Sequence, residues 1–309
     1  MNRRFWLSLL MGLPLAGFGQ IEMLQTDEGI LFTEQGKEVI YYQTEPKSLD
    51  GRYSRCHYFH PVWGLNGQII SEDFPADHLH HRGIFWAWHQ VWINGQRIGD
   101  PWEIRDFEQE VTEVEFWARR NGNALLKSEV VWKSPLWKKG QTPYLKENSE
   151  VVIYPRTGNF RRIDFTISLL ALEEGLSIGG SEDEKGYSGF SVRMVLPADV
   201  AFSGPSGMVT PQNTAVESPG YVNVSSQGEA GNQPFGVVIL DHPKNPGYPQ
   251  PWILRRQKSM QNIVFPGNKT VPVSTVTPLV LRYTLLIHNG SLTSKQIGSI
   301  QKKMAAEKF

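Results

Sequence analysis

The chain has 309 residues, and 31 Lys and Arg balance 31 Asp and Glu, so its formal net charge at pH 7 is zero. This balance, without any basic run, argues against a nucleic-acid partner. Cys56 is the single cysteine, which excludes an intramolecular disulfide, and 29 Gly and 20 Pro favour a turn-rich β protein.

The first residues have the pattern of a cleavable secretory signal. A positively charged start precedes an apolar run over residues 5–19, and Gly17 and Gly19 occupy the −3 and −1 positions of the expected cleavage site. The run is shorter than the roughly 20 residues of a membrane span, and no later stretch approaches that length. We therefore expect a signal peptide at 1–19, a periplasmic or secreted chain at 20–309, and no membrane span after cleavage.

Most of the mature chain has the composition of β-strands. Segments rich in β-branched and aromatic residues alternate with turn signals that contain Gly, Pro and Asn. The expected strands are 38–43, 110–120, 124–133, 149–155, 160–172, 189–196, 235–241 and 279–288. In 160–172, Ile163, Phe165 and Ile167 alternate with polar residues, which indicates one solvent-facing side. The sequence predicts a single all-β domain over 20–309, an antiparallel β-sandwich.

Only the C-terminal tail has a helical pattern. Ile297, Ile300 and Met304 fall on one stripe of the segment TSKQIGSIQKKMAAEK, and Ser291 or Thr293 can cap its start. We expect a short C-terminal helix there.

The stretch DFPADHLHHRGIFWAWHQVW, residues 73–92, contains four of the eight histidines of the chain. Taken as a strand, its second half turns Trp86 and Trp88 to one face and His89 to the other, among apolar neighbours. A histidine in that setting is predicted to be a hydrogen-bonded core residue.

The first half of this stretch follows Pro75 and is expected to be a loop. Asp77, His78, His80 and His81 bring one carboxylate and three imidazoles within five positions, which favours acid–base chemistry over loop capping. We predict that His80 or His81 is the general acid or base and that Asp77 orients it. The alternative is a metal ion held by His78 and His80, with Asp77 or His242 completing the site, and no other cofactor is predicted.

Other segments supply candidates for the same site. Lys185 and Arg193, in a glycine-containing segment, are predicted to stabilise negative charge on the substrate. His60 is restrained by the proline that follows it, and a proline-rich loop carries further polar groups. The predicted substrate-binding residues are His60, Arg82, Trp86, Trp88, Tyr187, Asp241, His242, Asn245 and Trp252.

Four segments together resemble a bacterial family of unknown function often labelled methane oxygenase PmoA-like. They are residues 57–90, 183–193, 239–255 and 281–290, which span nearly the whole mature chain. The resemblance implies a β-supersandwich similar to galactose mutarotase and a place among carbohydrate-utilisation systems. The motif positions that match are His60, Asp77, His78, His80, His81, Arg82, Lys185, Gly186, Arg193, Asp241, His242 and Asn245. Since the particulate methane oxygenase subunit lies in a membrane complex and no span is expected here, we do not predict that activity.

Tryptophans near polar loops decide the substrate class, because sugar rings stack on aromatic faces while their hydroxyls bond to polar groups. At least half of Trp63, Trp86, Trp88, Trp102 and Trp252 are nevertheless expected in the core. The sequence therefore predicts a carbohydrate or sugar-derived ligand. We expect an exported carbohydrate-active enzyme of the hydrolase, lyase or epimerase class, with a non-catalytic carbohydrate-binding protein as the first alternative and a metal-dependent enzyme as the second.

Overall fold

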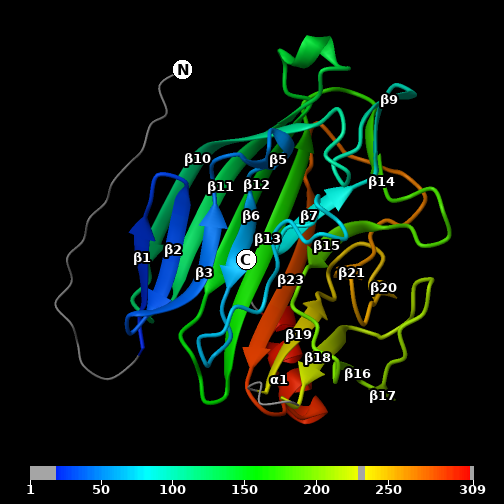
Figure 1. Ribbon diagram of the computed structural model, residues 1–309. Coiled ribbons are helices and arrows are strands. Elements are labelled where there is room, and N and C mark those ends of the chain that lie inside the picture. Colours follow the sequence, from blue (N-terminus) through cyan, green and yellow to red (C-terminus); the bar gives the residue numbers. More distant parts are fainter. Residues whose placement is uncertain (1–18, 229–233, 307–309) are drawn as a thin grey trace.

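The computed structural model describes residues 19–228 and 234–306, and the predicted signal peptide lies outside them apart from its last residue. Two large antiparallel sheets pack face to face, with the strands coloured blue in front of the green ones (Figure 1). One continuous apolar core draws residues from both sheets. The predicted all-β sandwich is confirmed.

The first sheet has eight strands. In spatial order they are β1 (Ile21–Gln25), β2 (Gly29–Glu34), β3 (Lys37–Gln43), β6 (Tyr58–Val62), β7 (Ile84–Trp88), β15 (Ser188–Val192), β21 (Gln261–Ile263) and β20 (Trp252–Ile253).

The second sheet has nine strands. In spatial order they are β10 (Glu108–Ala118), β11 (Ala124–Lys133), β12 (Leu145–Ile153), β13 (Phe160–Ala171), β23 (Leu279–His288), β19 (Phe235–Asp241), β18 (Tyr221–Ser226), β16 (Ala201–Gly204) and β17 (Gly207–Met208).

Two smaller sheets accompany the sandwich. A four-stranded sheet runs in the order β22 (Val271–Pro272), β14 (Leu176–Gly179), β8 (Gln90–Ile93) and β9 (Gln96–Gly99), and β4 (Lys47–Leu49) pairs with β5 (Arg52–Arg55). A single 3₁₀ turn covers Lys138–Gly140.

Side-chain alternation explains the position of β13 in the sandwich. Ile163, Phe165 and Ile167 point into the core, as predicted, and Thr166 and Ser168 are half-buried on the outer side. Asp164, on that outer side, is buried instead, because Arg162 pairs with it at 2.7 Å and Thr284 donates a hydrogen bond at 2.5 Å.

The predicted strand after Gly83 is interrupted. β7 belongs to the eight-stranded sheet, His89 leaves the ladder, and β8 continues into the four-stranded sheet. The alternation predicted from the sequence therefore holds only as far as Trp88. His89 is bonded to Asp100 at 3.1 Å, which confirms the predicted hydrogen bond, but it is half-buried and not in the core as predicted.

The C-terminal helix forms as predicted. α1 (Ser294–Ala306) packs Ile297 and Met304 on Val238, Leu240 and Leu286, which lie on the outer face of β19 and β23. The helix thus covers the outer face of the second sheet at β19 and β23 (Figure 1). Within the described residues, no helix combines the length and apolar character that crossing a membrane requires.

Thr293 caps α1 through a reciprocal pair of bonds. Its Oγ1 accepts from the amide of Gln296 at 3.2 Å, and Gln296 Oε1 accepts from the amide of Thr293 at 2.9 Å. Replacing Thr293 with alanine is expected to lower the free energy of unfolding by about 1 kcal/mol, measured by chemical denaturation. The matched control is Ser291→Ala, since the side chain of Ser291 makes no capping bond; equal effects would contradict the assignment of the cap.

Candidate functional site

Three imidazoles meet in the loop between β6 and β7. The rings of His78 and His81 stack with centroids 4.7 Å apart and planes within 2°, and His80 meets His81 edge-on at 4.5 Å. His81 is buried, His80 is nearly so, and 43% of the His78 side chain is exposed. Only His78 therefore presents much of its ring to solvent. We call these three residues the histidine cluster.

Arg193 holds this loop from the other side of the chain. It lies directly after β15, is 2% exposed, and donates to both carboxylate oxygens of Asp77 at 2.8 and 3.0 Å. Its Nε also donates to Glu72 at 2.7 Å, and its Nη1 donates to Nδ1 of His81 at 3.3 Å. Because the guanidinium is fully engaged, Arg193 positions the loop and is not free to bind a substrate anion as predicted.

The proton positions on two histidines follow from their partners. Arg193 can only donate, so Nδ1 of His81 accepts and its proton lies on Nε2. Nδ1 of His78 lies 2.7 Å from Asp77 Oδ2, and an ionised carboxylate can only accept, so this nitrogen carries the proton. Nε2 of His78 is left as a base. Asp77 thus orients His78, and not His80 or His81 as predicted. Nδ1 of His81 is bonded to Arg193 instead.

Burial and neighbouring charge shift the ionisation of this loop. Desolvation, reinforced by His78 and Arg55, lowers the pKa of His80 to about 3. Desolvation and the adjacent histidines and Arg193 also hold the pKa of His81 far below its ordinary value. Burial alone would raise the pKa of Asp77, but the bonds from Arg193 and His78 bring it below its usual range. His80 and His81 are therefore neutral at any physiological pH.

These shifts predict a loss of stability in acid. Below pH 6.5 the unfolded chain protonates His80 while the folded chain does not, so the free energy of unfolding falls as the pH drops from 6.5 toward about 3. Between pH 6.5 and 5 we expect His80 to account for about 1–2 kcal/mol, measured by denaturation of the wild type and of His80→Gln at both pH values. Equal acid dependence in the wild type and in His80→Gln would contradict the assignment to His80.

A cleft of about 680 Å³ opens beside the cluster. Its walls are the β4–β5 hairpin and residues 103–109. Glu103 on one wall lies 3.6 Å from Nδ1 of His80, and the ring of Tyr53 on the other lies 6.5 Å from that imidazole. The cleft thus borders His80 through these two residues, while none of the three histidines is among its lining residues.

Aromatic side chains pack against the histidine cluster. Trp102 meets His81 edge-on at 6.2 Å and stacks on His89 at 5.3 Å, and Tyr187 lies 5.6 Å from Trp102. Tyr187 also accepts a hydrogen bond from Arg255 at 2.7 Å. Tyr187, predicted as a substrate contact, therefore packs on Trp102, which in turn contacts the cluster.

Four of the five tryptophans considered for sugar stacking lie in the core, as at least half were expected to. Trp86, Trp88 and Trp252, which were predicted to bind substrate, are each at most 2% exposed. Their indole nitrogens donate to Glu147, Phe265 and Ser218 inside the protein. This location corrects the prediction, because a ring with no exposed face cannot stack on a sugar.

Arg82 and His60 hold neighbouring segments together. Arg82 is fully buried, donates to Asp73 at 2.9 Å and lies over the ring of Phe74. Nδ1 of His60 bonds to Ser71 at 2.8 Å, and desolvation lowers the pKa of His60 to about 4. Arg82 therefore cannot contact a substrate as predicted, while His60 is half-buried close to this loop.

The proline-rich loop after β19 forms a separate cluster under α1. Asn245 donates to the buried Asp241 at 2.9 Å, and Nε2 of His242 donates to the carbonyl of Met304 at 3.4 Å. Burial raises the pKa of Asp241 to about 6. Of the predicted substrate contacts, His242 thus contacts the helix, Asp241 and Asn245 bond to each other, and none of the three joins the histidine cluster.

Lys185 does not join the cluster either. Its ammonium pairs with Asp183 at 3.5 Å within the same exposed turn. The prediction that Lys185 stabilises charge beside the imidazoles is therefore not supported by its contacts.

The sequence interpretation missed three members of the site: Glu72, Glu103 and Tyr53. Glu72 had a signal, since it directly precedes the histidine-containing stretch as a second carboxylate. Glu103 and Tyr53 had none, because only the fold brings their segments to His80.

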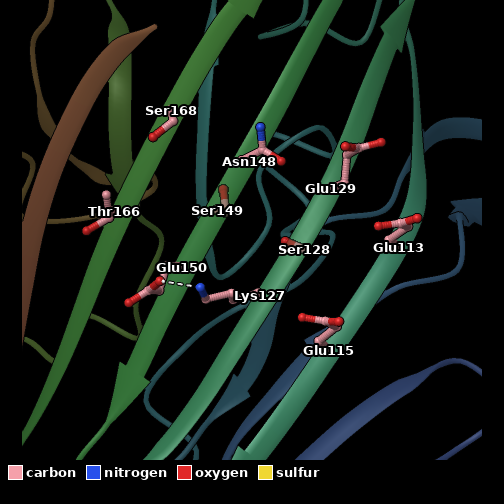
Figure 2. Close-up of a pocket in the computed structure, with 10 residues that line it drawn as sticks. All are labelled: Glu113, Glu115, Lys127, Ser128, Glu129, Asn148, Ser149, Glu150, Thr166 and Ser168. Atoms are coloured by element: carbon pink, nitrogen blue, oxygen red, sulfur yellow. Dashed lines mark ion pairs between the residues drawn. The ribbon is translucent and has the colours of Figure 1, made fainter. Parts of the chain in front are cut away.

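A second hollow lies on the outer face of β10–β13. It is an open groove of about 320 Å³ lined by charged, amide and hydroxyl side chains from four adjacent strands (Figure 2). Lys127 pairs with Glu150 across it at 3.3 Å. The partly exposed ring of Trp117 lies beside it, 5.8 Å from the Lys127 ammonium. Its residues are Glu113, Glu115, Lys127, Ser128, Glu129, Asn148, Ser149, Glu150, Thr166 and Ser168.

Comparison with known proteins identifies a family and no activity. The family model described as "Family of unknown function (DUF6807)" matches residues 30–301. No curated protein matches the chain. Among the described residues, no group of three or more His, Cys, Asp or Glu side chains is arranged to hold a metal ion.

Proposed function

Because this chain belongs to DUF6807, a family of unknown function, we propose its activity from its own site: an exported carbohydrate-active enzyme that uses His78 as its acid–base group. The observation that carries the proposal is the chain of contacts from Arg193 through Asp77 to His78. The base is oriented by a carboxylate that is itself fixed by two bonds from a buried guanidinium, which is how proteins position an imidazole for proton transfer.

In the proposed reaction, Nε2 of His78 removes a proton from a sugar hydroxyl, a sugar C–H group or water. The charge that develops on the imidazole is stabilised by Asp77 through the Nδ1 bond of 2.7 Å. Hydrolysis, elimination and epimerisation all need this transfer. The adjacent cleft of about 680 Å³ falls within the range of small-molecule sites, and Tyr53 offers an aromatic ring there.

The test is a turnover assay on a panel of oligosaccharides and glycosides, with the chain from Gln20 onward. Product formation is expected on at least one of them, and His78→Asn is expected to abolish most of it. Binding of sugars without any product would contradict an enzyme.

A non-catalytic carbohydrate-binding protein is the second candidate, and the outer groove favours it. The groove combines hydroxyl, amide and carboxylate groups with the nearby ring of Trp117, which together suit a sugar chain. For this candidate, Trp117→Ala weakens binding of the oligosaccharide and His78→Asn does not.

A further inference from the structure

We propose that the cleft beside the histidine cluster binds the carboxylate of an acidic sugar, and that Arg55 supplies its countercharge. The sugar part of this inference rests on the proposed function. The anionic part rests on Arg55 alone, which is the last residue of β5 and lines the cleft.

Arg55 is a buried cation without a counter-ion. It is 3% exposed, Nη2 donates to the carbonyl of Pro101, and the guanidinium lies 5.3 Å from the ring centre of Phe85. Its Nε has no hydrogen-bond acceptor in the part of the chain that the structure describes. Among the described residues, no carboxylate lies within 4 Å of its nitrogens.

The other buried arginines differ from Arg55 in having a carboxylate partner, although the Nε atoms of Arg82 and Arg161 also lack an acceptor among the described residues. Arg82 pairs with Asp73, Arg161 with Glu34, and Arg193 with both Glu72 and Asp77. Burying a guanidinium without such a partner costs free energy. We infer that a bound anion pairs with the guanidinium of Arg55 and offsets this cost.

The walls of the cleft favour a carboxylate on a ring-shaped ligand. Arg52 and Arg105 add positive charge at the rim, against Glu103 and Glu108. A guanidinium matches a carboxylate in geometry as well as in charge, since its parallel N–H groups can bond both oxygens. Tyr53 stands on the same wall as Arg55, where its ring can cover the face of the sugar.

The experiment compares sugars that differ only in this carboxylate. Binding of methyl glucuronide and methyl galacturonide is measured by calorimetry against methyl glucoside, methyl galactoside and inorganic phosphate. We expect at least one uronide to bind about tenfold or more tightly than its neutral counterpart. We expect Arg55→Met to remove this difference, and Arg119→Met, at an exposed arginine that does not line the cleft, to leave it unchanged.

The folding of the variants is also informative. Because Arg55 is uncompensated, Arg55→Met is expected to unfold at a temperature no lower than the wild type does without ligand. If that variant fails to fold, Arg55→Lys keeps a charge without the bidentate geometry and is expected to weaken uronide binding by about tenfold.

Each outcome bears on the inference. Equal affinity for uronides and neutral sugars overturns the role of Arg55 and leaves the proposed enzyme standing. Binding of phosphate alone overturns the acidic sugar, as does the absence of uronide binding. Tight uronide binding without any turnover supports the anion site while contradicting the proposed acid–base function.

Discussion

Replacing Glu147 with alanine is expected to lower the free energy of unfolding by about 3–5 kcal/mol. Glu147 is fully buried between the sheets, where it accepts from His57 at 2.7 Å, Trp86 at 2.7 Å, Ser149 at 2.6 Å and Trp132 at 3.1 Å. Removal leaves all four donors unsatisfied in the core. Burial alone would raise the pKa of this carboxyl, but His57 and these bonds lower it overall.

The matched control is Glu150→Ala on the same strand. Glu150 faces outward and pairs with Lys127 at 3.3 Å and Arg119 at 3.7 Å, so its loss is expected to cost under about 1 kcal/mol. Chemical denaturation of both variants measures the difference. Equal losses of stability would show that the buried network contributes nothing beyond a surface ion pair.

Replacing His78 with asparagine is expected to lower turnover of the substrate by about 10²–10⁴-fold. The asparagine amide can still donate to Asp77 in place of Nδ1, so the loop stays in position while the base is lost. The measurement is kcat on whichever sugar the panel identifies, with the KM expected to change little.

His81→Asn serves as the comparison for this variant. His81 is buried and neutral, and its Nδ1 accepts from Arg193, so this change is expected to affect stability more than the pH dependence of turnover. A larger loss of kcat in His81→Asn than in His78→Asn would return the acid–base role to His81.

Regular alternation made much of the fold predictable. The expected strands 124–133, 235–241 and 279–288 have the bounds observed for β11, β19 and β23, because each combines an apolar core face with clear turn signals. β12 begins four residues before the predicted strand 149–155, since its first inward residues include the polar Glu147. Likewise β15 ends at Val192 and not at residue 196, because Arg193 turns away to bond Glu72 and Asp77.

The site was less predictable, for a physical reason. The local density of histidines located the loop, but the role of each ring depends on which nitrogen Arg193 reaches, and that residue is 116 positions from Asp77 in sequence. The tryptophans illustrate the same difficulty. In the sequence, Trp86 and Trp88 fit a sugar-stacking surface as well as they fit a packed core. Only the packing of the two sheets shows that both rings are buried.

The chain passes from β7 through His89 directly into β8, so two strands separated by one residue belong to different sheets. Unpairing of β8 in the four-stranded sheet is therefore expected to disturb β7 at the centre of the eight-stranded sheet. In hydrogen exchange, the amides of β7, β8 and β14 are then expected to become exposed in one event. The loop of the histidine cluster, which leads directly into β7, is thereby tied to this same opening event.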